Sequence, residues 1–186
     1  MTALRAVVLV EGASDRAAVL ALAELRGRDL AADGVDVLAI GGAQAVGRFV
    51  DLYGPHGRDL RLAGLCDAGE EAEFRRALER AGIGSPTTRA ELEALGFGVC
   101  DRDLEDELIR ALGPPAVERL LEAHGDLRAF RTLQKQPSWR GRPAHEQLRR
   151  FFGSGGSRKV VYAPLLVRAL GPALVPRPLA VVLDRI

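Results

Sequence analysis

The stretch VLVEGASDRAAVLAL, residues 8–22, contains a buried strand, a tight turn and the start of a helix. Its continuous Val- and Leu-rich run is typical of a strand that is covered on both faces, and Ser14 can cap the helix that follows. Glu11 stands where this strand ends, and Asp15 follows four residues later. Backbone amides at such a turn attract anions, whereas two carboxylates repel them. The turn therefore indicates phosphate chemistry only if a metal ion intervenes.

Strand-like and helix-like segments alternate through the first 112 residues. Apolar runs predict strands at 5–10, 35–40, 60–66 and 97–100. Periodic patterns predict helices from Ser14 to about Gly27 and at 43–53, 70–81, 103–112, 116–124, 126–136 and, as the last helix, 157–170. The alternation predicts an α/β fold with a central, mostly parallel, four-stranded sheet flanked by helices. Because the strand patterns stop at Gly113, we expect an α/β core at 1–112 and a helical extension at 113–186.

The composition excludes several classes of protein. The chain has 186 residues, of which 47% are hydrophobic, and this is enough for a substantial core. No apolar run approaches the roughly 20 residues of a membrane helix, and the opening residues lack the layout of a secretory signal. Cys66 and Cys100 have no metal-type spacing. We expect a cytoplasmic protein with no membrane partner.

The charge is unevenly distributed along the chain, although its formal net value is only +1. Residues 70–107 are mainly acidic, and residues 135–159 are mainly basic. Such a distribution is common for two solvated faces. It is also what an acidic metal site beside a basic, polyanion-binding wall requires.

Acids stand at or near the ends of three predicted strands. They are Glu11 after the first strand, Asp67 after the third, and Asp101 and Asp103 after the fourth. The carboxyl ends of parallel strands lie on one edge of a sheet, where ligands bind. Carboxylates gathered there repel one another unless a cation such as Mg²⁺ lies between them. Taken singly, Asp15 and Asp103 also fit as helix caps.

The first turn does not carry a nucleotide-binding signature. The sequence EGASD has neither the G-x-G-x-x-G fingerprint nor a Walker-type lysine. It resembles the opening motif of Toprim domains, in which a Glu ends the first strand and a Gly follows. The segments AGLCDAGEE (63–71), GVCDRDLEDELIRALG (98–113) and SGGSRKVVYAPLLVRAL (154–170) resemble, in the same order, later motifs of the Toprim portion of OLD (overcoming lysogenization defect) nucleases.

The resemblance implies a Toprim fold, which is Rossmann-like, and phosphodiester hydrolysis with two Mg²⁺ or Mn²⁺ ions. It assigns metal binding to five acids, namely Glu11, Asp15, Asp67, Asp103 and Glu105. It makes Glu11 and Asp67 catalytic, together with Lys159 or its neighbour Arg158, which would stabilise charge on the phosphate. The GG pair at 41–42 also fits the family, although a plain turn explains it equally well.

This chain departs from the family pattern in two respects. Where Toprim proteins carry Asp-x-Asp, it has Asp67, Ala68 and Gly69. Glu70 or Glu71 can replace the missing acid, or can simply start a helix. OLD proteins also carry an ABC-type ATPase before the Toprim domain, whereas the sequence here starts at the Toprim strand. We therefore expect a stand-alone Toprim protein that uses a separately encoded ABC/SMC-like ATPase or needs none.

The basic segment contains the residues that we expect to contact nucleic acid, Arg140, Arg142, Arg149, Arg150 and Lys159. Trp139 lies among them and can stack on a base, although a lone tryptophan more often packs against the protein core.

Three functions fit these observations. The first is a Toprim/OLD-type nuclease, an endonuclease or nickase that acts on DNA, with RNA as a second substrate class. The second is a non-catalytic nucleic-acid-binding or regulatory partner of a separate ATPase. The third is a Toprim enzyme of RNA processing or another phosphoryl transfer. Each is compatible with a homodimer.

Overall fold

The core of the protein is a sheet of four parallel strands. The computed structural model describes residues 3–155 and 157–186. Its strands are β1 (Ala6–Val10), β2 (Val35–Ala39), β3 (Arg61–Asp67) and β4 (Phe97–Cys100). They lie in the order β2-β1-β3-β4, and every pair is parallel. The expected α/β fold with four strands is confirmed, and the pairing among them is entirely parallel.

Alternate residues of the strands enter two separate hydrophobic cores. In β1, Ala6, Val8 and Val10 face one core, whereas Val7 and Leu9 face the other. All five residues of β1 are fully buried, because helices cover both faces of the sheet. This explains why the strand reads as a continuous apolar run rather than an alternating one.

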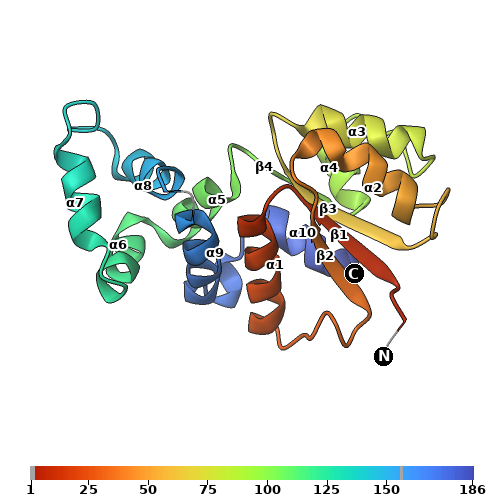
Figure 1. Ribbon diagram of the computed structural model, residues 1–186, viewed down its shortest axis with the longest axis horizontal. Coiled ribbons are helices and arrows are strands. Elements are labelled where there is room, and N and C mark those ends of the chain that lie inside the picture. Colours follow the sequence, from red (N-terminus) through yellow and green to blue (C-terminus); the bar gives the residue numbers. More distant parts are fainter. Residues whose placement is uncertain (1–2, 156) are drawn as a thin grey trace.

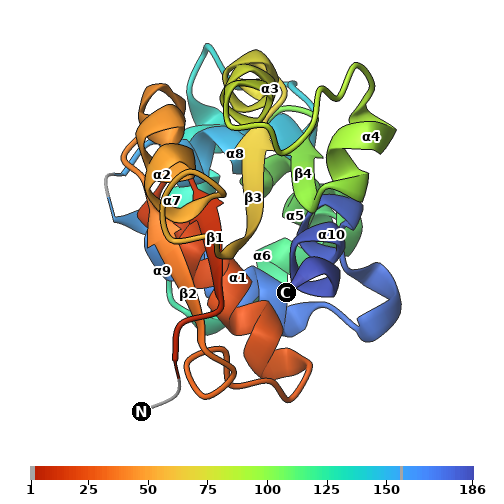
Figure 2. The ribbon, with the colours of Figure 1, turned by 90° about the vertical axis from the view of Figure 1, so that its right-hand side faces the viewer.

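Helices from the middle of the chain cover one face of the sheet. They are α2 (Val46–Tyr53), preceded by the short 3-10 helix η1 (Ala43–Ala45), then α3 (Glu71–Arg80) and α4 (Arg89–Ala94). Figure 1 shows them together above the strands, and Figure 2 shows the same layer end-on. Phe74 of α3 packs edge-on against Phe97 of β4. The loops after β2 and β3 lead directly into this layer.

Helices from the two ends of the chain cover the opposite face. They are α1 (Ala13–Leu25) and α10 (Arg177–Arg185), whose buried residues belong to the core that includes Val8 and Val10. Gly98 of β4 allows close packing by α10, because a Cβ atom at this position would lie 2.2 Å from the carbonyl oxygen of Pro178. The end of the chain thus returns to the sheet.

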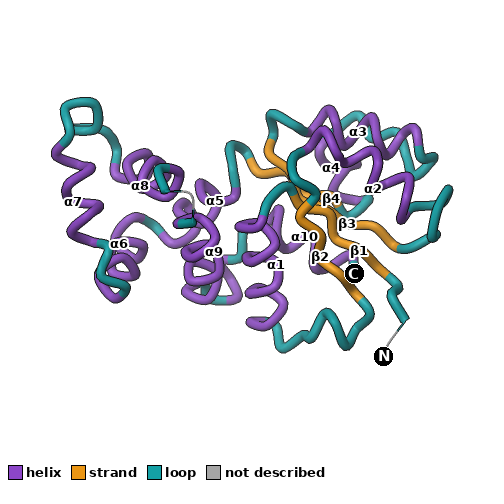
Figure 3. The backbone as a smooth tube through the Cα atoms, viewed as in Figure 1, coloured by secondary structure: helices purple, strands orange, loops and turns teal. Residues whose placement is uncertain are grey.

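The segment between β4 and α10 forms a helical lobe beside the sheet, as Figure 3 shows by secondary structure. It contains α5 (Leu104–Leu112), α6 (Pro114–Ala123), α7 (Leu127–Lys135), α8 (Ala144–Gly153), α9 (Arg158–Ala169) and the short 3-10 helix η2 (Pro172–Leu174). Helix α9 packs along α1, and this contact places the start of α9 near the end of β1. The boundary expected at Gly113 falls between α5 and α6, while the core of this lobe continues into the sheet.

Three helices were not expected from the sequence, namely α4, α8 and α10. The prediction that the last helix ends near residue 170 is wrong, because α10 follows it. Among the described residues, no helix has the length and apolar character needed to cross a bilayer.

Candidate active site

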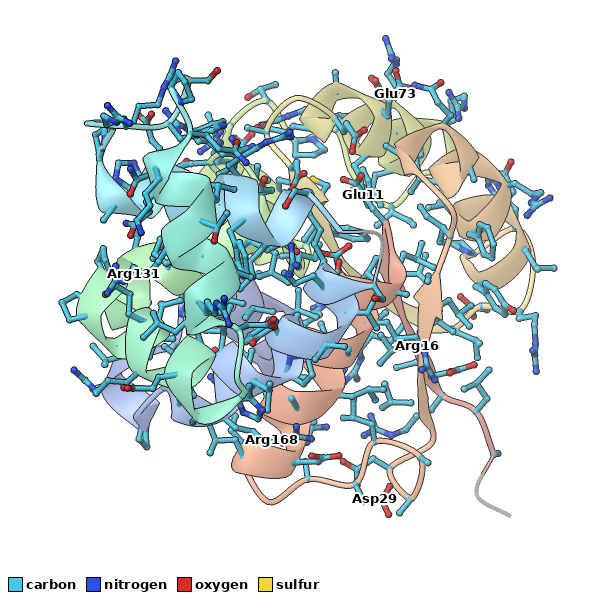
Figure 4. The ribbon with its side chains drawn as sticks, turned by 60° about the vertical axis from the view of Figure 1, so that its left-hand side comes forward. Glu11, Arg16, Asp29, Glu73, Arg131 and Arg168 are labelled. Atoms are coloured by element: carbon cyan, nitrogen blue, oxygen red, sulfur yellow. The ribbon has the colours of Figure 1, made fainter. Side chains whose placement is uncertain are left out.

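Glu11 and Asp67 lie next to each other at the ends of the neighbouring strands β1 and β3. The helices that follow these two strands pack on opposite faces of the sheet. Helix α1 leaves the end of β1 on one face, whereas α3 leaves the end of β3 on the other, and ligands of open α/β sheets bind at such a point. The amide of Asp67 donates a hydrogen bond to Glu11 Oε1 at 3.1 Å. Figure 4 shows Glu11 at the end of β1 and Arg131 and Arg168 well away from it on the helical lobe.

Both carboxyl groups are costly to ionise in this place. Burial raises the pKa of Glu11 to about 8, and a hydrogen bond that the protonated Glu11 carboxyl shares with the Glu70 carboxylate adds to the rise. Burial also raises the pKa of Asp67 to about 7, and the charges of Asp15, Asp103, Glu70 and Glu105 act in the same direction. These acids therefore face one another closely enough to interact electrostatically.

Glu70 supplies an acid near the position where Gly69 leaves the Asp-x-Asp pattern incomplete. It occupies the N-cap position of α3, but its side chain makes no capping hydrogen bond. Its carboxyl group lies beside Glu11 instead. Glu71, the other substitute considered from the sequence, forms ion pairs with Arg75 and Arg89. The structure thus brings Glu70, rather than Glu71, to Glu11 and Asp67.

Asp15 has a structural hydrogen bond as well as a place near the cluster. The amide of Gly12 donates to Asp15 Oδ2 at 2.9 Å, and this fixes the turn between β1 and α1. Burial raises the pKa of Asp15 to about 6, and the nearby charge of Glu105 raises it further. Both expectations for Asp15 therefore have a basis in the structure: it stabilises the helix start, and it lies within electrostatic reach of the acids from other elements.

Asp103 and Glu105 approach from the first turn of α5, and each is paired with a cation. The amide of Asp106 donates to Asp103 Oδ1 at 2.9 Å, so Asp103 caps the helix, while its Oδ2 lies 2.7 Å from Arg149 Nη2. Glu105 is 3% exposed, and Lys159 Nζ lies 2.8 Å from its Oε2. Burial lowers the pKa of Lys159, but Glu105, Asp103 and Asp15 together raise it above its ordinary value.

Two residues singled out in the sequence point elsewhere. Arg158 donates to the carbonyl oxygen of Phe151 at 2.9 Å, and its guanidinium lies 4.0 Å from the centre of the Phe151 ring. Asp101 is exposed and forms ion pairs with Arg89 and Arg110. The structure therefore places Lys159, and not Arg158, at the carboxylates.

The donor set fits a divalent cation. In the described part of the chain, two buried side-chain oxygens have no hydrogen-bond partner, Glu70 Oε2 and Glu105 Oε1. Unpartnered buried oxygens are rare, and carboxylate oxygens suit Mg²⁺ and Mn²⁺. Within the same residues, no three His, Cys, Asp or Glu side chains are already arranged as a metal shell. The clustered acids are neutralised instead by Lys159, Arg149 and raised pKa values.

A basic pocket of about 640 Å³ adjoins the acids. Asp103 and Lys159 line it, so the pocket and the carboxylate cluster share a wall. Three of the other residues expected to contact nucleic acid, Arg142, Arg149 and Arg150, line it too. Arg140 does not, since its guanidinium donates to the carbonyl oxygen of Lys135 at 3.3 Å.

Residues 4–67 match the family model described as "Overcoming lysogenization defect protein-like, TOPRIM domain". Over this segment the chain is similar to an OLD-like Toprim domain. The match contains Glu11, Asp15 and Asp67, whereas Glu70, Asp103, Glu105 and Lys159 lie beyond it.

Solved structures extend the likeness of the OLD-like Toprim domain to the whole chain. The C-terminal region of the OLD protein of Xanthomonas campestris pv. campestris is similar with a TM-score of 0.74 and 22% identity, covering 100% of this chain and 95% of that one. The C-terminal region of the Burkholderia pseudomallei OLD protein gives a TM-score of 0.73 and 20% identity, covering 98% and 96%. At sequence identities this low, the structural similarity establishes the fold and nothing further. No curated protein matches the chain in sequence.

Two features of this candidate site were not predicted from the sequence. The side-chain position of Glu70 depends on the tight turn after β3, in which the Glu70 amide donates to the Asp67 carbonyl oxygen at 2.9 Å. The pairing of Arg149 with Asp103 depends on α8, which was not expected. The spacing of Glu70 from Asp67, one residue beyond the family pattern, was the available signal for the first.

Proposed function

We propose that this chain is a metal-dependent nuclease, a hydrolase that cuts phosphodiester bonds of nucleic acid, with DNA as its first substrate. One observation supports this proposal above the others. Acids from the ends of β1 and β3 and from the start of α5 meet beside Lys159, and two of their buried oxygens have no partner among the described residues. A site for cations beside a partly exposed ammonium suits a phosphodiester, which carries negative charge before and during cleavage.

The metal-binding residues that we propose come from three elements. Glu11 and Asp15 flank the first turn, Asp67 and Glu70 follow β3, and Glu105 belongs to α5. We also propose Asp103, whose pairing with Arg149 must loosen if it is to bind a cation. When bound, two Mg²⁺ or Mn²⁺ ions would supply an activated water and stabilisation of the leaving oxygen.

The chain's own cations act on the phosphate in this proposal. Lys159 is held beside Glu105 by an ion pair that is half open to solvent, since 39% of its side chain is exposed. Its ammonium can therefore contact a phosphate oxygen without losing Glu105 as its support. Arg149 holds Asp103 at the edge of the same site. Both residues would offset the charge that develops on the phosphate oxygens.

The test is a panel of substrates and metal ions. The purified protein is incubated with supercoiled DNA, linear DNA and structured RNA, each with Mg²⁺, Mn²⁺ or EDTA, beside Glu11→Ala and Asp67→Ala. We expect metal-dependent nicking or cutting of DNA by the wild type and loss of cleavage in both variants. Absence of cleavage by the wild type, or cleavage unchanged in both variants, contradicts the proposal. Preferential cleavage of RNA would favour a Toprim enzyme of RNA processing.

A second candidate is a nucleic-acid-binding or regulatory partner of a separately encoded ABC/SMC-like ATPase. It is favoured by the ion pairs of Asp103 and Glu105, which neutralise the site without a metal, and by the basic pocket beside it. Binding of DNA in EDTA together with no cleavage in any metal would support this candidate.

A further inference from the structure

The basic pocket beside the carboxylates has a flat aromatic surface as well as positive charge. It lies between the turn before α8, helix α8 itself, the start of α9 and the loop after β4. Five cations line it, namely Arg102, Arg142, Arg149, Arg150 and Lys159. They outnumber the two carboxylates of the lining, Asp103 and Glu146. Trp139 forms part of the same wall.

Trp139 is held in place before any ligand arrives. One part of the side chain packs against the core of the helical lobe. Its carbonyl oxygen accepts a hydrogen bond of 2.8 Å from Gln147, which is 5% exposed. The side-chain oxygen of Gln147, Oε1, in turn accepts a hydrogen bond of 2.7 Å from the side-chain amide of Gln134. A fixed ring loses little conformational entropy on binding.

Two guanidinium groups flank the tryptophan ring. Those of Arg142 and Arg150 lie 5.1 and 5.9 Å from its centre. In the described part of the chain, Arg150 and Arg102 are in no ion pair with a carboxylate, whereas Arg142 lies 3.8 Å from Glu146. Planar cations beside an aromatic ring offer stacking surfaces for a base and charge for the adjoining phosphates.

We propose that this pocket binds an unpaired base of a single-stranded nucleic-acid segment, together with its phosphate. A base within a duplex is already stacked and paired, and it can lie on Trp139 only if it leaves the helix. The pocket shares Asp103 and Lys159 with the carboxylate site. Given the function proposed above, the bound nucleotide therefore lies next to the phosphodiester that is cut.

The test uses the fluorescence of Trp139, which is the only tryptophan of the 186 residues. The full chain is titrated in EDTA with single-stranded DNA, single-stranded RNA, a blunt duplex and an abasic strand of equal length. We expect strong quenching by a single-stranded nucleic acid and little by the duplex or the abasic strand. Equal quenching by the abasic strand, or by the duplex, would overturn the proposal.

Variants separate the aromatic contribution from the charge. Binding of a labelled strand is followed by anisotropy for Trp139→Leu, Trp139→Phe, Arg150→Gln and Arg128→Gln. We expect about a tenfold loss of affinity for Trp139→Leu, substantial recovery in Trp139→Phe, and weakening in Arg150→Gln. Arg128→Gln removes the same charge from the exposed surface of α7 and should bind as the wild type does. Equal affinity of Trp139→Leu and wild type would contradict a stacking role.

The outcome is independent of cleavage. If base-dependent quenching is observed but nucleic acid is never cut, the proposed base-binding pocket stands and the proposed nuclease function is wrong. If DNA is cut but no base-dependent quenching is observed, the proposed nuclease function stands and the proposed base-binding pocket is wrong.

Discussion

Glu105 of α5 and Lys159 of α9, 54 residues apart, form an ion pair between two helices of the lobe, beside the acids at the end of the sheet. Lys159 Nζ lies 2.8 Å from Glu105 Oε2, while Glu105 Oε1 is buried and has no partner among the described residues. One oxygen thus has a cation of the chain, and the other is left for a ligand. In the proposed function, one residue pair would therefore serve both the stability of the site and the binding of a metal ion.

Removal of Lys159 should therefore destabilise the metal-free protein. In Lys159→Met the buried Glu105 carboxylate loses its cation partner, and we expect the free energy of unfolding to fall by about 2 kcal/mol. Urea denaturation in EDTA measures this change. The double variant with Glu105→Gln should recover much of the loss, because no buried charge remains. A loss of equal size in the single and double variants would show that packing of the lysine stem, and not the ion pair, is responsible.

Acids that are costly to ionise should make the metal-free protein less stable as the pH rises. The pKa values of Glu11 and Asp67 are raised to about 8 and about 7, so the folded state binds protons that the unfolded state releases near pH 4. The stabilising effect of these protons is complete below pH 4 and is lost as the pH rises to about 8. Urea denaturation in EDTA between pH 5.5 and 8.5 should show the decline, and Glu11→Gln should flatten it. An increase in stability over this range would contradict the raised values.

Metal binding should have the opposite dependence on pH. Cations require ionised carboxylates, so the rise in melting temperature caused by Mn²⁺ should grow from pH 6 to pH 8. Differential scanning fluorimetry measures this shift. Asp101→Asn is a matched control, because Asp101 stands at a strand end but forms ion pairs with arginines. A shift that is independent of pH, or that Asp101→Asn abolishes as fully as Asp67→Asn does, would place the metal elsewhere.

Glu70 should compensate for the glycine at position 69. A Cβ atom on Gly69 would meet no atom within 4 Å, so a side chain can start there without a steric clash at Cβ. We expect Glu70→Gln to weaken the Mn²⁺-induced stabilisation and the added change Gly69→Asp to restore part of it. Calorimetric titration with Mn²⁺ measures both. If Glu70→Gln binds Mn²⁺ as the wild type does, Glu70 is not a ligand.

The close packing of α10 on β4 can be tested separately from the site. A methyl group on Gly98 would collide with the backbone of Pro178, so Gly98→Ala should cost about 1–3 kcal/mol in the free energy of unfolding. Gly69→Ala has open space around it and should cost far less. Equal costs in urea denaturation would show that α10 is held less closely than its position on β4 implies.

The sheet was predictable because each strand is a short, largely apolar segment, with Gly or an acid at its end or within two residues after it, although β2 contains the exposed Asp36. Helix α10 was not predicted, although Pro176 and Pro178 stand at its start, where proline is favoured. Helix α4 has only six residues, and its signal was the capping box of Thr88 and Glu91. Short helices of this kind are fixed by tertiary packing more than by pattern.

The acids at the strand ends were predictable for the same reason, since parallel topology brings strand ends to one edge. The sequence did not predict which of Glu70 and Glu71, or which of Lys159 and Arg158, lies at the carboxylate cluster. Neighbouring residues on a turn or helix point in different directions, and their partners belong to other elements. Arg158 lies over Phe151 of α8, a helix that was not expected.

The most direct test of the proposed nuclease site is the rate at which supercoiled DNA is nicked in Mn²⁺. The rate is compared for the wild type, Asp67→Asn and Asp101→Asn, after circular dichroism has shown that all three are folded to the same extent. We predict metal-dependent nicking by the wild type, a loss of at least about 100-fold in Asp67→Asn, and a rate near that of the wild type in Asp101→Asn. No nicking by the wild type, or equal nicking by wild type and Asp67→Asn, would contradict the claim that these carboxylates form a metal-dependent nuclease site.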